Sequence, residues 1–251
     1  MSEPTELAPN IWLFQGEADS ANYGAVLARE TALLVYAAAN APDETGTPPI
    51  NEFLDSRGVD RWAVITLGEY SGEELDTSHW SYMHMDNDMS GKMSGYPWPQ
   101  KETVDTDGNF ELPIPGWQFL SLYGPYAPSV HNATDGILFS GYVLAGEHAP
   151  ELCKGGQEYL RELEHIEKLD PKLVVPSHGQ PTQGKREVRA RVERDKQYVY
   201  AVQRHVQTAK AAGHNLDRTL QAARTAYEDY PFVETHVRNV QRVWEEEQVA
   251  C

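Results

Sequence analysis

Residues 136–144 read GILFSGYVL, an apolar run with a glycine near its end. A second apolar run, at 174–179, reads VVPSHG and also ends in polar residues and a glycine. Short apolar runs bounded by turn-forming residues are typical of buried β-strands. Between the two runs, a segment from about Glu151 to Lys168 repeats apolar residues at helical spacing until Asp170-Pro171 interrupts it. These residues predict two buried strands joined by a helix.

The first half of the chain predicts further strands by the same pattern. Residues 29–31 predict a hairpin turn between two of them, and a Pro- and Gly-rich loop at 41–49 leads to a short predicted helix near Ile50 to Ser56. The predicted strands are Ile11–Phe14, Tyr23–Leu27, Ala32–Tyr36, Trp62–Thr66, Trp117–Tyr123, Ile137–Gly141 within the run Gly136–Leu144, and Leu173–Pro176.

From Arg186 to the end, the sequence predicts helices. Asn215 is a suitable N-cap for one of them, and another follows Tyr230-Pro231. The chain has no internal repeat and no linker. It therefore predicts a single domain over residues 1–251, in which residues 186–251 form C-terminal helices.

The composition is that of a globular protein, with 40% hydrophobic and 24% charged residues in a chain of 251. The formal net charge of −17 argues against nucleic-acid binding, because phosphate recognition needs a basic face. No apolar run approaches the roughly 20 residues of a membrane span, and the N-terminus lacks the basic region of a secretory signal. We therefore expect a cytoplasmic protein without a membrane partner. Cys153 and Cys251 are expected to be free thiols, and the sequence predicts no cofactor.

Residues 73–116 are the least regular stretch and predict a lid or insertion. They combine acidic residues, prolines, methionines and tryptophans, and an irregular segment of this length is typical of a binding loop. Trp80, Met85 and Trp98 are therefore candidates for contact with an apolar ligand. A copper or haem site within 79–93 is the alternative, because imidazole and thioether ligate soft metals, but the spacing matches no compact ligand set.

Four blocks, in this order and spacing, resemble the metallo-β-lactamase superfamily. They are AVLARETALLVY at 25–36, WAVITLGEYSG at 62–72, GILFSGYVL at 136–144 and VVPSHG at 174–179. Arg238 to Trp244 resembles the closing helix of some hydrolase branches, and there is some resemblance to the flavodiiron and glyoxalase II-like branches. The resemblance implies an α+β fold: an αββα sandwich with a helical C-terminal extension.

The chemistry of this family requires two metal ions, held by imidazoles and carboxylates, with a bridging hydroxide as the nucleophile. The resemblance aligns Leu67, Glu69, Ser71 and Gly72 with the His, His, Asp and His ligands of its first metal-binding loop. Only Glu69 could ligate a metal, and a glutamate at this position also resembles the flavodiiron branch. Leu67 and Gly72 offer no donor atom.

The remaining ligand positions are also replaced, with one exception. Pro125 or Tyr126 stands at the third histidine, Tyr142 at the bridging aspartate, and Tyr36 at the aspartate that supports the site. His178 alone is retained as a histidine. One imidazole and one carboxylate cannot hold two divalent ions tightly. The resemblance therefore implies a degenerate member that has lost the dinuclear site.

In such a sandwich the loops after the central strands meet at one end, so Glu69, Tyr142 and His178 are expected to share a pocket. His178 is the candidate general base, because only imidazole has an unperturbed pKa near neutrality. Glu69 would orient it or take a proton itself, and Tyr142 would stabilise developing negative charge. The residues expected to contact the substrate are Tyr36, Tyr126, His131, Trp80, Met85 and Trp98. The sequence thus favours a metal-independent enzyme, of hydrolase, lyase or cyclase type, that acts on a small organic substrate.

Two alternatives stay open. A non-catalytic binding protein or partner subunit would keep the fold, and its tyrosines would only fill the space left by the metals. A hydrolase with a rebuilt metal site would take its ligands from Glu69, His79, His84, His131 and His178. A homo-oligomer and a complex with a partner protein are both compatible with the sequence.

Overall fold

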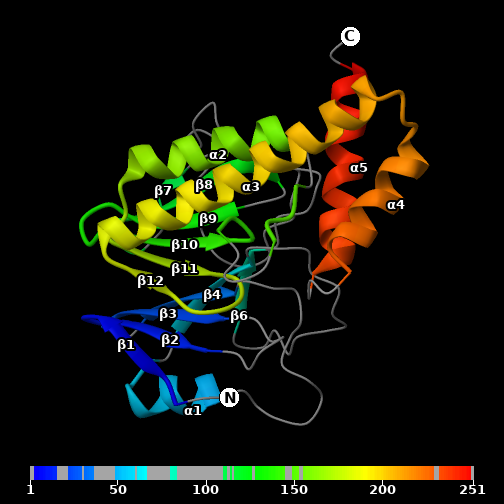
Figure 1. The fold of residues 1–251 in the computed structure, drawn as a ribbon. Coiled ribbons are helices and arrows are strands. Elements are labelled where there is room, and N and C mark those ends of the chain that lie inside the picture. Colours follow the sequence, from blue (N-terminus) through cyan, green and yellow to red (C-terminus); the bar gives the residue numbers. More distant parts are fainter. Residues whose placement is uncertain are drawn as a thin grey trace.

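Two β-sheets stack face to face between layers of helices (Figure 1). The computed structural model describes residues 3–15, 22–29, 31–36, 49–59, 61–66, 80–83, 110–111, 114, 116–125, 128–144, 149–152, 155–228 and 232–249. Within them the αββα arrangement implied by the sequence is confirmed.

The first sheet has the strand order β1-β2-β3-β4-β5-β6. Strands β1 to β4 pair antiparallel, whereas β4, β5 and β6 run parallel to one another. The strands are β1 (Thr5–Ala8), β2 (Ile11–Phe14), β3 (Tyr23–Ala28), β4 (Thr31–Tyr36), β5 (Arg61–Thr66) and β6 (Trp80–Met83).

The second sheet has the strand order β12-β11-β10-β9-β8-β7. Its strands pair antiparallel except for β10 and β11, which are parallel. The strands are β7 (Phe110–Glu111), β8 (Trp117–Pro125), β9 (Pro128–Asn132), β10 (Ile137–Gly141), β11 (Leu173–Pro176) and β12 (Thr182–Gln183).

Helices cover the outer faces of both sheets. Helix α1 (Pro49–Ser56) packs on the first sheet, and α2 (Gly156–Leu169) and α3 (Lys185–Ala211) cover the second (Figure 1). Helices α4 (Leu216–Ala226) and α5 (Val233–Val249) stand together at one end of the molecule, where α5 packs against α3 and α2. The C-terminal helices predicted from the sequence are thus present, and no described helix is long and apolar enough to cross a membrane.

Alternation along the strands sorts the apolar side chains into three layers. In β4, Leu33 lies between the two sheets and Leu34 packs toward α1. In β10, Phe139 lies between the sheets and Leu138 packs toward α2 and α3. These strands are buried on both faces, which explains why they are continuous apolar runs in the sequence.

The sequence placed most of these strands correctly, but one prediction about strands was wrong. The strand predicted at Ile137–Gly141, within the apolar run 136–144, is confirmed, and the chain turns after it, where Gly141 and Leu144 take left-handed backbone conformations with φ of 57° and 60°. The stretch predicted to be irregular contains β6, which extends the first sheet beside β5, and β7. Residues 84–109 of that stretch lie outside the described residues.

The predicted helix from Glu151 begins later, at Gly156. A carboxylate from the far end of the chain defines this start, because Glu246 accepts hydrogen bonds from the backbone N–H groups of Gly156 (2.8 Å) and Gln157 (3.1 Å). Such an acceptor satisfies the amides that have no partner within the first turn of a helix. The predicted N-cap of α4 is confirmed, since the Asn215 side chain accepts from the Arg218 N–H at 3.0 Å.

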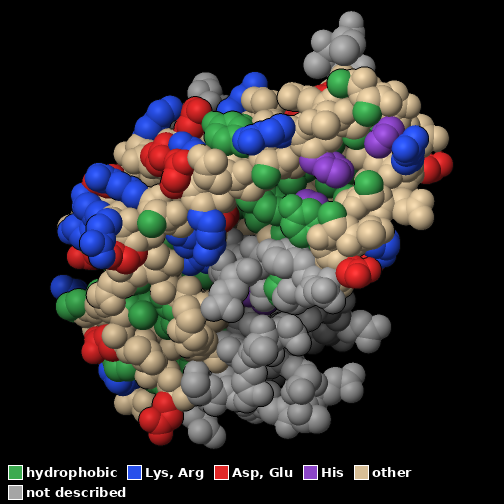
Figure 2. Space-filling view, viewed as in Figure 1, with side chains coloured by type: hydrophobic (Ala, Val, Ile, Leu, Met, Phe, Trp, Pro, Cys, Tyr) green, Lys and Arg blue, Asp and Glu red, His purple; other side chains and the backbone are tan. Residues whose placement is uncertain are grey.

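Charged side chains of both signs are mixed on the surface. On the face shown in Figure 2, Lys and Arg side chains lie among Asp and Glu side chains. Several cations of the second sheet's helices are paired: Lys185 and Arg189 both contact Asp170, and Lys196 contacts Glu167. Exposed pairs of this kind add little stability.

Candidate functional site

The candidate site lies where the parallel strands β10 and β11 end. Gly141, the last residue of β10, is in register with Pro176, the last residue of β11. The chain after each strand therefore starts at the same level, and it carries Tyr142 on one side and His178 on the other. The two rings are tilted by 34°, with centroids 6.3 Å apart. Both side chains are half-buried, so the structure brings these two predicted site residues together.

Ser177 fixes the loop that carries His178. Its backbone N–H donates to the carbonyl of Gly141 at 2.7 Å, which joins the end of β11 to the end of β10. Its hydroxyl lies 3.0 Å from Nδ1 of His178. Ser177 is fully buried, so its hydroxyl is held in place and orients the half-buried imidazole through this contact.

Asn22, which immediately precedes β3, connects the first sheet to the same loop. Its backbone N–H donates to the carbonyl of Ser177 at 2.7 Å. Its side-chain Nδ2 donates to the carbonyls of Pro176 at 2.9 Å and Gly179 at 2.8 Å. The side chain is only 2% exposed. One residue of the first sheet thus makes three hydrogen bonds to the segment around His178.

The register of the first sheet places other predicted positions near this contact. Tyr23, the neighbour of Asn22, pairs with Tyr36 at the end of β4, and Tyr36 pairs with Thr66 at the end of β5. The backbone at the ends of β4 and β5 is therefore at the level of Asn22. Glu69 follows β5 but lies outside the described residues.

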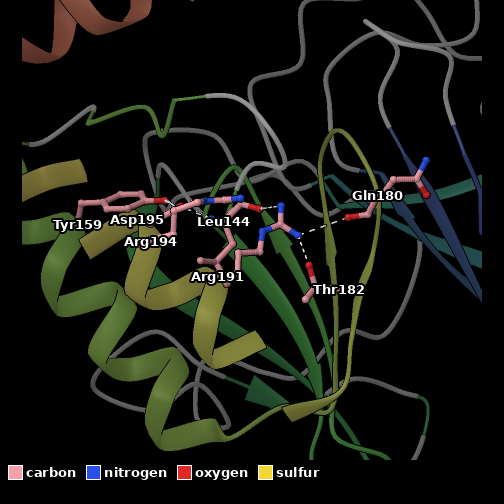
Figure 3. A network of polar contacts seen from close by, with 7 residues as sticks. All are labelled: Leu144, Tyr159, Gln180, Thr182, Arg191, Arg194 and Asp195. Atoms are coloured by element: carbon pink, nitrogen blue, oxygen red, sulfur yellow. Dashed lines mark hydrogen bonds and ion pairs between the residues drawn. The ribbon is translucent and has the colours of Figure 1, made fainter. Parts of the chain in front are cut away.

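Arg191 of α3 holds the two loops of the site from the helix side (Figure 3). Its guanidinium donates to the carbonyl of Leu144, in the turn after β10. It also donates to the Thr182 hydroxyl and, at 3.4 Å, to the carbonyl of Gln180, beyond His178. Its planar array of donors allows one side chain to bridge the segments that carry Tyr142 and His178.

The charge of Arg191 is balanced by a buried acidic group one helical turn further along α3. Asp195 accepts a hydrogen bond from the Tyr159 hydroxyl at 3.0 Å and contacts Arg194 at 3.3 Å. Burial lowers the pKa of Arg191 to about 10, and burial raises the pKa of Asp195 despite its cationic neighbours. The pKa of Tyr159 is raised well above its usual value, by burial first and then by Asp195. At neutral pH, Arg191 is therefore charged and Tyr159 is neutral.

His131 lies elsewhere in the fold. It pairs with Leu138 across β9 and β10, so its side chain faces the helix layer with Leu138 and not the first sheet with Phe139. It is 3% exposed, and neither ring nitrogen has a hydrogen-bond partner within the described part of the chain. Burial lowers the pKa of this imidazole.

The other predicted contact residues are described in part or not at all. The backbones of Tyr36 and Trp80 lie at the end of β4 and the start of β6, on the first sheet. Tyr126, Met85 and Trp98 lie outside the described residues.

The described donors do not fit a dinuclear metal site. Tyr142 places a phenol where a dinuclear site would require a bridging carboxylate. Beside this phenol, the described part of the chain places the imidazole of His178. Among the residues that the structure describes, no three His, Cys, Asp or Glu side chains form a group that could hold a metal ion.

Sequence patterns did not single out Asn22, Ser177 or Arg191. Their roles depend on hydrogen bonds to backbone groups far away in the sequence, which no local pattern encodes. A weak signal did exist for Arg191, because Arg191 and Asp195 lie on the apolar stripe of the helix together with Val188 and Val199. Charged residues on a buried stripe are rare unless they are paired.

No family model matches the chain, and no curated protein matches its sequence. Solved structures do match it. The inverting sec-alkylsulfatase Pisa1 from Pseudomonas sp. superposes with a TM-score of 0.64 at 10% identity over 97% of this chain. This chain spans 50% of the alkylsulfatase, about half its length.

Two further solved structures are matched by this chain over nearly their whole length. A metallo-β-lactamase family protein from Thermus thermophilus has a TM-score of 0.59 at 12% identity, over 98% of this chain and 95% of its own. A metallo-β-lactamase from Pseudomonas aeruginosa, in its mono-zinc form, has a TM-score of 0.55 at 12% identity, over 79% of this chain and 94% of its own. Likeness at such low identity establishes the fold alone. The chain has the metallo-β-lactamase fold.

Proposed function

We propose that the chain is a hydrolase-like enzyme that acts on a small organic substrate by acid–base and electrostatic catalysis, without a dinuclear metal site. The observation that carries this proposal is the Tyr142–His178 pair, with ring centroids 6.3 Å apart after two adjacent parallel strands. In layered α/β folds, ligands bind beyond the carboxyl ends of such strands. The fold that this chain shares with an alkylsulfatase and several β-lactamases supports the same location.

His178 would act as the general base. An imidazole is suited to this role near neutral pH, and the Ser177 hydroxyl 3.0 Å from Nδ1 sets the orientation of the ring. Tyr142 would donate a hydrogen bond from its phenol to negative charge that develops on the substrate. Glu69, which follows β5, would orient His178 or accept a proton.

The residue types at the ancestral ligand positions support a mechanism without two metal ions. Leu67 and Gly72 carry no donor atom, and Tyr142 replaces the carboxylate that would bridge the ions. The hydrogen bonds of Asn22 and Ser177 hold the His178 loop through the protein itself. A catalytic histidine can thus be positioned without a metal ligand network.

Chromogenic esters provide the test. We expect the protein to hydrolyse p-nitrophenyl acetate or p-nitrophenyl sulfate at a rate that dialysis against EDTA leaves unchanged. His178→Ala should lower kcat/KM by about 100-fold or more, the usual contribution of a general base. Tyr142→Phe should lower kcat more than it changes KM, because it removes only the hydroxyl group.

The matched control is His165→Ala, since His165 is exposed on α2. Its activity should equal that of the wild type. Loss of activity on chelation, restored by zinc, would contradict the metal-independent mechanism. Saturable binding of the esters without turnover would instead favour the non-catalytic binding protein.

A further inference from the structure

Asn22 is distinctive among the buried polar residues because it joins the two sheets beside the candidate base. Its amide Nδ2 bonds to Pro176 and Gly179, the residues on either side of the Ser177-His178 pair. Its backbone N–H bonds to Ser177 itself. The partners lie 154 and 157 positions away along the chain for the two side-chain bonds, so this contact is purely tertiary.

These bonds restrict how the loop can move. Two carbonyls that flank a dipeptide and share one buried amide donor cannot rotate independently without losing a hydrogen bond inside the protein. The Ser177 hydroxyl, located between them, contacts Nδ1 of His178. The path from Asn22 to the imidazole therefore runs through a single buried residue.

The other end of the path is the first sheet. Asn22 adjoins Tyr23, and the pairs Tyr23–Tyr36 and Tyr36–Thr66 extend across β3, β4 and β5. A shift of these strands relative to the second sheet would reach the His178 loop through Asn22. Conversely, the three bonds of Asn22 fix the distance between that loop and the ends of β4 and β5.

We propose, on the basis of the site proposed above, that Asn22 is a positioning residue that sets the orientation of His178 toward Tyr142 and toward the ends of β4 and β5. It acts through the backbone of residues 176–179 and the Ser177 hydroxyl. Asn22 itself is buried and does not touch the substrate.

A role in general stability is the competing explanation, and Asn239 provides the matched control. Asn239 is also a buried asparagine, 1% exposed, whose Nδ2 donates to the carbonyl of Pro150 at 2.7 Å and whose Oδ1 accepts from the Leu152 N–H at 3.0 Å. It stabilises a different segment, before α2. Asn239→Ala should therefore lower stability without changing the surroundings of His178.

The measurement is NMR of the full chain with labelled histidine and tyrosine. In the wild type, His178 resonances (assigned by their absence in His178→Gln) should show nuclear Overhauser contacts to the Tyr142 ring. In Asn22→Ala these contacts should be lost and the His178 ring resonances should shift. In Asn239→Ala, the contacts and the His178 ring resonances should remain as in the wild type, even if the melting temperature falls as far as it does in Asn22→Ala.

Asn22→Ser is the milder variant for use if Asn22→Ala does not fold. The serine hydroxyl can donate one of the two side-chain hydrogen bonds. The His178 resonances should therefore lie between those of the wild type and those expected for Asn22→Ala. Unchanged His178 resonances and contacts in a folded Asn22 variant would overturn the proposal. The readout needs no activity: an Asn22 effect on His178, combined with unaltered turnover in His178→Ala, would uphold the positioning role and refute the proposed function.

Discussion

His178 is surrounded by hydrogen bonds to the backbone of its own loop. Asn22 holds the carbonyls of Pro176, Ser177 and Gly179, and Arg191 holds the carbonyl of Gln180. Almost every carbonyl of this loop thus has a donor from a distant element. Such over-determination is what a preorganised catalytic side chain requires.

Arg191→Met should destabilise the protein by about 3 kcal/mol, because it leaves the Leu144 carbonyl without its donor and removes one of the two cations, Arg191 and Arg194, that compensate the buried Asp195. Equilibrium unfolding in urea would measure the change. Arg189→Met, two positions earlier on the same helix, is the control. Its exposed ion pair with Asp170 should contribute within about 0.5 kcal/mol. Equal losses of unfolding free energy in the two variants would contradict this role of Arg191.

His236 should make stability depend on pH. Burial, followed by the nearby His205, lowers the pKa of His236 from 6.5 to about 4. The unfolded chain therefore takes up the proton first, and stability is full above about pH 6.5 and is lost as the pH falls toward 4. The loss should amount to about 3 kcal/mol. In His236→Gln, this part of the decline in unfolding free energy should disappear; an unchanged pH profile would contradict the assignment.

The residues of the site could be predicted only in part. Tyr142 and His178 were found because the runs GILFSGYVL and VVPSHG resemble two blocks of the metallo-β-lactamase superfamily, and this resemblance aligns both residues with its metal-ligand positions. Asn22 and Arg191 were not, because their partners are carbonyl groups, which every residue type provides. His131 was expected at the pocket, but the alternation of β9 directs it to the helix layer, and that direction depends on a strand that the sequence pattern did not reveal.

At the level of secondary structure, the strands that are apolar runs were predictable, whereas β1, β6, β7, β9 and β12 were not. Strands β2 and β11 match their predicted bounds, because each is a short run of apolar residues. Strand β9 contains Ser129, His131 and Asn132, which are polar yet buried. Its hydrophobic pattern is therefore weak, and only its position between β8 and β10 explains it.

Strand β3 approaches the second sheet unusually closely at Gly24. A Cβ atom at this position would come within 2.3 Å of the Phe139 ring, which is buried against Trp117. Gly24→Ala should therefore cost about 1–3 kcal/mol of unfolding free energy, as overpacked cores do. In the double variant with Phe139→Leu, the two effects should be less than additive. Additive losses in a double-mutant cycle would show that Gly24 and Phe139 do not meet.

On the scale of the whole molecule, hydrogen bonds connect the two sheets and α3 to the segments that carry Tyr142 and His178. In metal-dependent sites the ions themselves tie ligand-bearing loops together, and their binding energy contributes to folding. In this chain Asn22 links the sheets and Arg191 links both loops to α3. Helix α5 adds Asn239 and Glu246, which hold the segment before α2 and its first turn. The fold therefore has a means of keeping the strand ends together that does not use metal ligands.

Elemental analysis of the purified protein tests this account most directly. We expect zinc and iron far below stoichiometric amounts, because four of the ancestral ligand positions carry Leu67, Gly72, Pro125 or Tyr126, and Tyr142. The same measurement on a His79→Ala, His84→Ala variant separates a rebuilt site from an ancestral one. About two divalent ions per chain, retained in that variant, would contradict the account.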